Sequence, residues 1–208
     1  MNLLCRFYDT TSGEVLVDGV NVRDMDLYNL RDNIGMAMQD VFLFSDTIEG
    51  NIAYGRPNCS FEEVKQAAIV ADANHFIQAL SDGYDTIVGE RGVGLSGGQK
   101  QRISLARALL KDPSILILDD TTSAVDMETE SYIQSQLKKL DNKCTIFVIA
   151  YRISSIKDAD LILVMDNGRI IEQGTHEELV AAGGYYATAF HNQYGEIPQE
   201  ILSGKGEK

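Results

Sequence analysis

The chain has 208 residues, and 44% of them are hydrophobic, which is enough apolar material for the core of one domain. Its 18 basic and 31 acidic residues give a formal net charge of −13. Nucleic-acid-binding proteins normally present a basic surface, so this balance argues against DNA or RNA as a partner. It also disfavours direct docking on an anionic membrane surface.

The cysteines and the apolar runs restrict the compartment and the membrane topology. Three widely spaced cysteines without a CxxC pair predict neither a disulfide framework nor a zinc site, and they are typical of a reducing cytosol. No apolar run approaches the roughly 20 residues that span a bilayer, and no signal peptide is visible. We therefore expect any membrane role to act through another polypeptide.

The first half of the chain contains short predicted strands and one clearly marked helix. Residues 14–17 and the segment IGMAMQ, which ends at Gln39, are predicted strands flanked by turn formers. Residues 60–71 predict a helix, because Ser60 and Glu63 have the spacing of a capping box.

A second capping box, formed by Ser96 and Gln99, opens a predicted helix that runs to about Lys111. Its apolar positions recur at helical spacing along one face, namely at Ile103, Ala106 and Leu110.

The second half of the chain has the pattern of a parallel sheet. Residues 114–119, 144–150 and 161–166 are continuous apolar runs, which is typical of strands covered on both faces. A helical pattern lies between the first two runs, at about 127–140. The result is a parallel α/β layer interrupted by a mostly helical insertion, at about 41–110.

Two further signals follow near the C-terminus. The dipeptide Asn167-Gly168 between two apolar runs predicts a two-residue hairpin. Thr175 and Glu178 form a third capping box, which starts the C-terminal helices.

The run ILILDD ends a predicted buried strand in two carboxylates, Asp119 and Asp120. Parallel strands deliver such residues to the carboxyl edge of the sheet, where α/β proteins bind ligands. An aspartate there can help to hold Mg²⁺ on the phosphates of a nucleotide. This pattern alone is weak, because apolar strands that end in aspartate are common.

The segment LSGGQ at residues 95–99 is more specific. Ser96 is a natural N-cap, and Gly97 and Gly98 leave backbone N–H groups bare at a helix N-terminus, where Gln99 completes the capping box. Free donors and the helix dipole make this a site for phosphate. A glycine-rich turn would explain SGG alone, but not the uninterrupted run from LSGGQ to ILILDD.

This run resembles the ABC ATPase family, and the resemblance covers essentially the whole chain. LSGGQ matches the family signature, Asp119 matches the Walker B aspartate, and Gln39 matches the Q-loop glutamine. In the family that glutamine senses Mg²⁺ and the attacking water, and it links to the transmembrane partner. For Gln39 alone, an amide at a strand end is the alternative.

Two loops extend the resemblance. Residues 123–126 match the D-loop, which in the family crosses the dimer interface, although Asp126 is also a candidate helix N-cap. TIVGERG at 86–92 resembles the X-loop of exporters, and residues 40–48 point the same way.

The resemblance implies an α/β fold with a RecA-like, P-loop NTPase-type parallel sheet core that is incomplete at its N-terminus. A helical ABC subdomain at 41–110 would carry the X-loop and the signature, and 111–208 would form the second part of the core.

The chain departs from the family in lacking the phosphate-binding motif GxxxxGK(S/T). Residues 1–8 resemble the helix that follows this motif, so 1–208 is predicted to be a nucleotide-binding domain without its Walker A region. A late gene start, a disrupted gene and a truncated record would each explain this.

Two other departures affect residues of the active site. The family has a catalytic glutamate where this chain has Asp120, whose side chain is one methylene shorter and reaches less far towards a water. The family has a switch histidine where this chain has Tyr151, whose neutral phenol cannot replace the proton chemistry of histidine near pH 7.

These observations predict the ATP-binding subunit of an ABC exporter, with ATP and Mg²⁺ as cofactors and Asp119 and Gln39 as Mg²⁺ ligands. The signature and Asp126 would contact the nucleotide of a second, non-identical nucleotide-binding domain. The chain would form the degenerate half of a heterodimer, and whether it is active alone stays open. Its other partner would be a transmembrane domain with coupling helices, at the cytoplasmic side of the cell membrane.

Two alternatives stay open. One is a fragment of an exporter gene without independent ATPase activity. The other is a soluble ABC protein of DNA repair or translation, which the TIVGERG segment disfavours.

Overall fold

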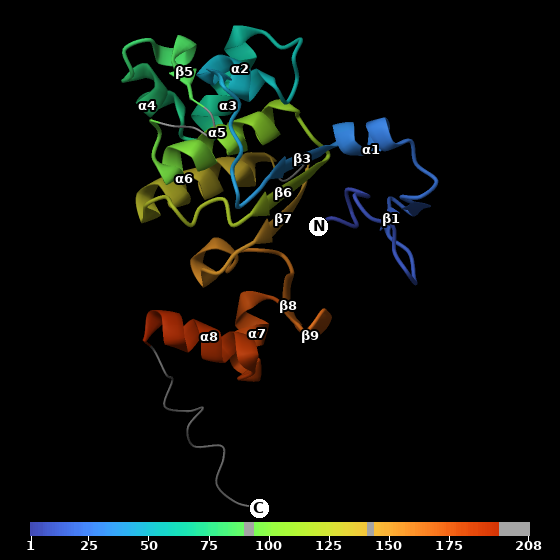
Figure 1. Cartoon of the computed structure of the whole chain (residues 1–208). Coiled ribbons are helices and arrows are strands. Elements are labelled where there is room, and N and C mark those ends of the chain that lie inside the picture. The colour runs from blue at the N-terminus through green and yellow to red at the C-terminus, as the bar shows by residue number, and fades with distance from the viewer. Residues whose placement is uncertain (90–93, 141–143, 196–208) are drawn as a thin grey trace, which may run out of the picture. The chain divides into compact units, whose positions relative to one another are not determined.

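The computed structural model of the chain describes residues 1–89, 94–140 and 144–195. They form two compact units, Met1–Ile149 and Ala150–Lys208 (Figure 1). Each unit has its own hydrophobic core. Among the described residues, none of the helices combines the length and the apolar character that crossing a bilayer requires.

The larger unit is built on a parallel sheet of three strands in the order β3-β6-β7. β3 (Ile34–Ala37) pairs with β6 (Ile115–Asp119), and β6 pairs with β7 (Thr145–Ile149). β-Branched side chains favour extended backbone in β6 and β7. Because the strands are parallel, their carboxyl ends meet at the same edge. The predicted α/β fold with a parallel sheet is confirmed.

Helices cover this sheet, and short elements connect them. The helices of the unit are α1 (Leu27–Asp32), α2 (Ile48–Ala53), α3 (Phe61–Val70), α4 (Asn74–Gln78), α5 (Gly97–Leu110) and α6 (Met127–Leu137). The described residues of this unit also contain the 3₁₀ turns η1 (Gly83–Asp85) and η3 (Lys138–Leu140) and an antiparallel pair, β4 (Asp46–Thr47) and β5 (Ile87–Val88). The helical pattern predicted for 127–140 therefore divides into α6 and η3.

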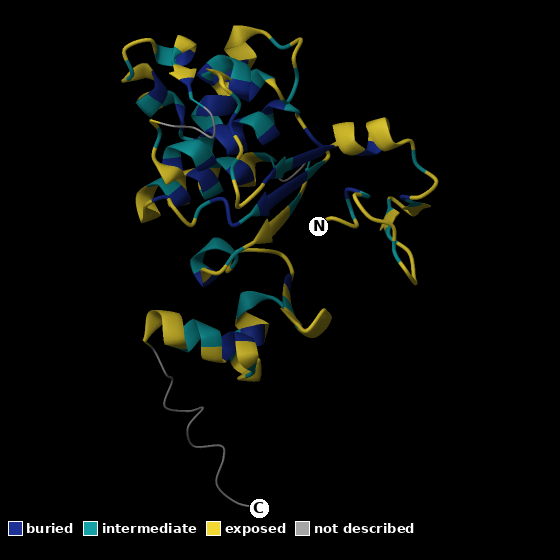
Figure 2. Ribbon diagram, in the orientation of Figure 1, coloured by how far each residue is buried: buried dark blue, intermediate teal, exposed yellow. Residues whose placement is uncertain are grey.

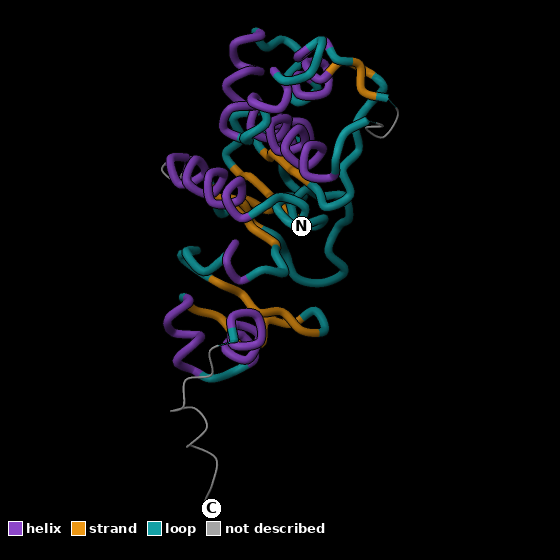
Figure 3. The backbone as a smooth tube through the Cα atoms, turned by 90° about the vertical axis from the view of Figure 1, so that its left-hand side faces the viewer, coloured by secondary structure: helices purple, strands orange, loops and turns teal. Residues whose placement is uncertain are grey.

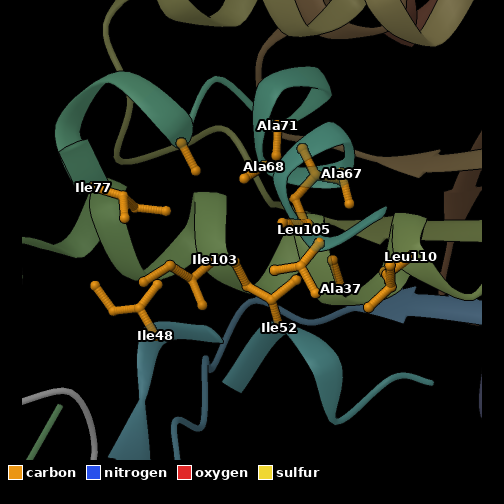
Figure 4. Close-up of a cluster of buried hydrophobic side chains, with 14 of the residues drawn as sticks. Ala37, Ile48, Ile52, Ala67, Ala68, Ala71, Ile77, Ile103, Leu105 and Leu110 are labelled. Atoms are coloured by element: carbon orange, nitrogen blue, oxygen red, sulfur yellow. The ribbon is translucent and has the colours of Figure 1, made fainter. Parts of the chain in front are cut away.

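Helix α5 lies between the sheet and helices α2 and α3, and both views of the backbone agree on this (Figures 1 and 3). Its predicted apolar face is buried, which confirms the roles of Ile103, Ala106 and Leu110. Ala67 and Ala68 of α3 pack against it with small side chains, so the two helices approach closely (Figure 4). Burying one isoleucine or leucine of this core stabilises the fold by about 2 kcal/mol.

The three capping boxes predicted from the sequence are all formed. In each, the N-cap hydroxyl accepts from the backbone N–H three residues later, and that residue's side chain accepts from the N-cap N–H. The pairs are Ser60 with Glu63 at α3, Ser96 with Gln99 at α5, and Thr175 with Glu178 at α7 (His176–Ala182).

Two segments differ from the prediction. The strands were expected to be covered on both faces, and β6 is buried along its centre, but Phe147, Val148 and Ile149 of β7 are each 37–38% exposed (Figure 2). Within the described residues β7 pairs with β6 alone, so it is not an inner strand. The predicted strand at 161–166 is also exposed along most of its length, because it pairs antiparallel outside the parallel sheet.

The N-terminal segment is also not the helix that the family resemblance suggested for residues 1–8. The N–H groups of Leu4 and Cys5 both donate to the carbonyl of Met1, and the chain then reverses at Arg6, whose φ of 50° is outside the helical region. A small antiparallel pair follows, β1 (Leu16–Val17) and β2 (Val20–Asn21).

The smaller unit is a hairpin packed with two helices. β8 (Ile162–Asp166) and β9 (Arg169–Gly174) pair antiparallel through Asn167 and Gly168, whose φ angles are 47° and 76°. Two positive φ angles are what a type I′ turn requires, so the predicted hairpin is confirmed. The 3₁₀ turn η4 (Ile153–Ser155), α7 and α8 (Tyr185–Tyr194) complete the unit.

Glu172 of β9 caps helix α8 from outside the helix. Its carboxylate accepts from the N–H groups of Tyr185 (2.5 Å) and Tyr186 (3.0 Å), two donors that the helix cannot satisfy itself. We expect Glu172→Ala to lower the stability of the unit by about 1 kcal/mol, measured as a fall in its thermal unfolding midpoint. Gln173→Ala, at the exposed neighbouring position, is the control. Equal effects of the two variants would contradict the capping role.

Candidate functional site

The carboxyl edge of the parallel sheet brings together the acidic residues of β6 and the glutamine that follows β3. The Nε2 atom of Gln39 donates to Oδ2 of Asp120 at 3.4 Å. Asp120 follows the last residue of β6, is buried, and has a φ of 50°. Aspartate tolerates this left-handed conformation better than most residues. The N–H of Asp120 donates to the carbonyl of Ile149 at 2.8 Å, which ties it to the end of β7.

Asp119 lies at the same edge and is partly exposed. To the described part of the chain its carboxylate makes neither a hydrogen bond nor an ion pair, and the Oε1 atom of Gln39 likewise accepts no hydrogen bond there. Two such oxygen donors are the kind of ligand that Mg²⁺ takes from proteins, with the rest of its shell supplied by phosphates and waters.

The LSGGQ segment begins helix α5. The Oγ atom of Ser96 accepts from the N–H of Gln99 at 3.3 Å, and Oε1 of Gln99 accepts from the N–H of Ser96 at 2.9 Å. This reciprocal cap leaves the N–H groups of Gly97 and Gly98 as the helix donors without an intrahelical acceptor.

The two glycines have different surroundings, which the sequence did not predict. Gly97 is exposed and Gly98 is buried. A Cβ atom at Gly98 would lie 2.7 Å from the carbonyl oxygen of Ala124, whereas one at Gly97 would be in ordinary contact, 3.5 Å from the Ala124 Cβ. Gly98 is therefore needed for the close packing of α5 on residues 123–126.

Asp126 is the N-cap of helix α6. Its carboxylate accepts from the N–H groups of Glu128 (3.1 Å) and Thr129 (3.0 Å) and from the hydroxyl of Thr129 (3.0 Å). These bonds, the Thr129 N–H foremost, hold the pKa of Asp126 below its ordinary value. The structural role considered for Asp126 from the sequence is thus present.

This cap should respond to pH. A depressed folded-state pKa means that the ionised carboxylate stabilises the fold above the unfolded pKa, and that this contribution is lost as the pH falls through the folded pKa. We expect Asp126→Asn, which keeps a capping side chain, to remove this part of the dependence of Tm on pH below about pH 4. Asp82→Asn, at a residue that caps no helix with its side chain, is the control. A Tm difference between parent and Asp126→Asn that is constant with pH would contradict the assignment.

Gln101 belongs to the site, although no motif in the sequence selects it. It is 7% exposed, and its Nε2 donates to the carbonyl of Asp120 (3.3 Å) and to Oγ of Ser123 (3.2 Å). Its Oε1 accepts from the N–H of Ala124 at 3.1 Å. The only signal in the sequence is a polar residue placed one turn after Gly97, on the face of α5 that is buried.

The loop that follows Gln39 is fixed by Asn51, which is fully buried in α2. Its amide nitrogen donates to the carbonyls of Phe44 (3.1 Å) and Thr47 (3.0 Å), and its oxygen accepts from the N–H of Phe44 at 2.8 Å. Arg107 of α5 completes the cluster by donating to Oδ1 of Asn51 at 3.1 Å and to its carbonyl at 2.7 Å. The same guanidinium lies over the rings of Phe44 and Tyr54.

A cavity of about 460 Å³ opens between these segments. It joins the loop after β3, the first turns of α5 and the D-loop segment, and its lining residues are Gln39, Asp40, Val41, Phe42, Gly97, Lys100, Gln101 and Ala124. The structure therefore places Gln39, Gly97 of LSGGQ and Ala124, in the segment before Asp126, around one cavity.

Two predicted features are not among the residues that line this cavity. Tyr151 belongs to the smaller unit, where its side chain is 74% exposed and its carbonyl accepts from Nε2 of Gln193 at 2.7 Å. In the segment at 86–92, Ile87 and Val88 form β5, and residues 90–92 are outside the described ranges.

A parallel sheet with carboxylates at its carboxyl edge, together with a helix that begins at two glycines, is typical of nucleotide-binding α/β proteins. Residues 1–123 match the family described as ABC transporter. The chain belongs to the ABC transporter family, as its motifs predicted.

The relatives are similar along nearly the whole chain. The uncharacterized ABC transporter ATP-binding protein YknU of Bacillus subtilis is 55% identical over 195 residues, which cover 94% of this chain and 33% of that protein. YgaD of the same organism, named for multidrug export as an ATP-binding/permease protein, is 53% identical over 190 residues, which cover 91% of this chain and 33% of that protein. The chain thus spans about a third of the length of these relatives.

A solved structure agrees with this assignment. A bacterial Atm1-family ABC exporter with ATP bound superposes with a TM-score of 0.91 at 47% sequence identity, covering 94% of this chain and 34% of that one. The α/β P-loop NTPase fold predicted from the sequence is therefore confirmed.

Proposed function

We propose that this chain is the nucleotide-binding domain of an ABC exporter, in which ATP binding and hydrolysis in a head-to-tail domain dimer drive the export of a substrate. The similarity to an exporter with ATP bound and to a protein named for multidrug export supports this. So does the cavity that joins the LSGGQ helix to Gln39 and the D-loop segment.

The predicted site residues divide into two groups according to the nucleotide that each group would contact. Asp119 and Oε1 of Gln39 would hold magnesium, which neutralises phosphate charge when it is bound. Ser96 and Gln99 would hold the first turn of α5 in shape, so that the free N–H groups of Gly97 and Gly98 reach the phosphates of the nucleotide on the second domain. Asp126 would lie at the interface between the two domains.

The finer proposal is that this chain is the degenerate half of a pair of non-identical domains. The observation that supports this proposal is Asp120. Its side chain is shorter than the catalytic glutamate that the family has at this position, and its carboxylate already accepts a hydrogen bond from Nε2 of Gln39. A general base needs heavy-atom reach of about 2.6–3.2 Å to its water, directly or through one water. Tyr151 stands at the position of the switch histidine, and a phenol does not supply the acid–base chemistry of an imidazole. The LSGGQ element is intact by comparison.

Two partner assignments and one division of the chain follow from this proposal. The second nucleotide-binding domain would supply the competent catalytic residues to the site that LSGGQ completes. A transmembrane domain would dock through coupling helices, which places the chain on the cytoplasmic side of the membrane. Within the chain, 41–110 would be the helical subdomain and 111–208 the second part of the α/β core.

The test is the ATPase activity of the exporter that carries this chain, assembled alone or with the exporter half encoded beside it. We expect the mixed assembly to hydrolyse ATP at least about tenfold faster, since a well-placed general base contributes about 10²–10⁴-fold. Equal rates for the two assemblies would refute the degenerate-half proposal.

A variant that restores the family's residues sharpens this test. We expect Asp120→Glu combined with Tyr151→His to raise the activity of the assembly made of this chain alone by at least about tenfold. Asp82→Glu, which adds the same methylene at an exposed site, is the matched control and should leave the rate unchanged. Failure of the double variant to raise the rate would count against the two residues as the cause.

A further inference from the structure

Gln101 connects helix α5 to the residues that follow β6. In the function proposed above, on which this inference rests, these two parts of the chain contact different nucleotides. It lies on α5, one helical turn after Gly97, and its side-chain amide reaches across to the residues that follow β6. Its three hydrogen bonds, two donated and one accepted, all go to residues 120–124.

The hydrogen bond from Gln101 to Asp120 ends on a backbone carbonyl that has a second donor. The carbonyl of Asp120 accepts from both Nε2 of Gln101 (3.3 Å) and Oγ of Ser123 (3.1 Å). Asp120 has a left-handed backbone, and its side chain is held by Gln39. This carbonyl is bonded directly to the Cα atom that carries the carboxylate, so the two hydrogen bonds fix the backbone on which the carboxylate is held.

The first turn of α5 cannot move independently of this segment. Gly98 packs directly on the carbonyl of Ala124, leaving no room for a Cβ. The N–H of the same Ala124 is bound by Oε1 of Gln101. The start of the LSGGQ helix and residues 120–124 therefore form one hydrogen-bonded, closely packed piece.

An apolar side chain at 101 would fill the same space without the desolvation of an amide, but it would leave the N–H of Ala124 without this acceptor. A buried amide whose donors and acceptor are all used fixes a distance and an orientation, which apolar packing fixes less tightly.

We propose that Gln101 is a positioning residue that couples the two ATP sites to which this chain contributes. Engagement of LSGGQ with the nucleotide of the second domain is transmitted by the amide of Gln101 to the backbone of Asp120, in this chain's own site. A change at Asp120 is transmitted in the opposite direction by the same bonds, because coupling between two sites is reciprocal.

A double-mutant cycle in the exporter assembled with its partner half tests this. The variants are Asp120→Asn, Gln101→Met, which keeps the volume and removes all three bonds, and the two combined. We expect Asp120→Asn alone to change the ATP turnover at least about threefold, and to change it less than about 1.5-fold when Gln101→Met is present. A purely structural role for Gln101 would lower stability without altering the effect of Asp120→Asn.

Two further variants keep the test decisive if Gln101→Met folds poorly. Ser123→Ala removes one of the two donors at the Asp120 carbonyl and leaves Gln101 in place, so we expect an intermediate loss of coupling. Gln66→Ala, on the exposed face of α3, should leave the effect of Asp120→Asn unchanged.

The outcomes separate the two proposals. If the assembly hydrolyses ATP and the effects of Asp120→Asn and Gln101→Met simply multiply, the coupling role of Gln101 is wrong and the proposed function stands. If the assembly hydrolyses no ATP at all, the proposed function is wrong and the coupling role falls with it.

Discussion

Gly98→Ala should lower the free energy of unfolding by about 2 kcal/mol, whereas Gly97→Ala should leave it unchanged or slightly raise it. The added Cβ at 98 would lie 2.7 Å from a backbone oxygen, which cannot rotate away as a side chain can, so α5 and the D-loop segment have to separate. For a chain of this size the loss corresponds to a fall of about 4–8 °C in Tm.

The two neighbouring glycines make a matched pair for this experiment. Both substitutions add one methyl group to the first turn of the same helix, and they differ in what the methyl group meets. Thermal unfolding followed by circular dichroism measures both. If the two variants unfold at the same temperature, the close contact between Gly98 and Ala124 does not limit stability.

Asn51→Ala should be more destabilising still, by about 3 kcal/mol. The substitution removes the acceptor of the Phe44 N–H and of the Arg107 guanidinium, and the donor to three backbone carbonyls, all at a fully buried position. Buried polar groups that lose their partners cost about 1–3 kcal/mol each, reduced here wherever water can enter. The loop between Gln39 and α2 should also become susceptible to proteolysis, because Asn51 is what holds it.

The control for this prediction is Asn29→Ala. Asn29 is exposed on α1, and its side-chain oxygen accepts from a neighbouring side chain in the same helix, so its loss should change stability by no more than about 0.5 kcal/mol. Chemical denaturation of both variants gives the two values. An effect of Asn51→Ala as small as that of Asn29→Ala would show that the buried cluster is not what fixes the loop.

Much of the site could be predicted because its signals are local. A continuous apolar strand that ends in Asp119 places a carboxylate at the sheet edge whatever surrounds it, and the spacing of Ser96 and Gln99 defines a capping box by itself. Asn167 and Gly168 fix the hairpin in the same way, since few other residues accept two positive φ angles in succession.

The remaining features depend on contacts between distant segments, and the sequence does not specify these. Gln101 is one polar residue on an amphipathic helix, and only the fold shows that residues 120–124 lie within reach of it. The same holds for Gly98, whose burial depends on Ala124. The exposure of β7 could not be predicted either, because an apolar run indicates a strand but not how many neighbours it has.

The three capping boxes have a consequence for charge. At α3 and α7 the third helical residue is Glu63 or Glu178, and each of these helices carries two acids in its first turn, so the partial positive charge of its N-terminus is already compensated. At α5 the same position is Gln99, and the first turn contains no acid. The neutral amide closes the cap with the same geometry but leaves the positive end of the helix dipole uncompensated. Of these three helix starts, only the one at LSGGQ therefore keeps its attraction for an incoming anion.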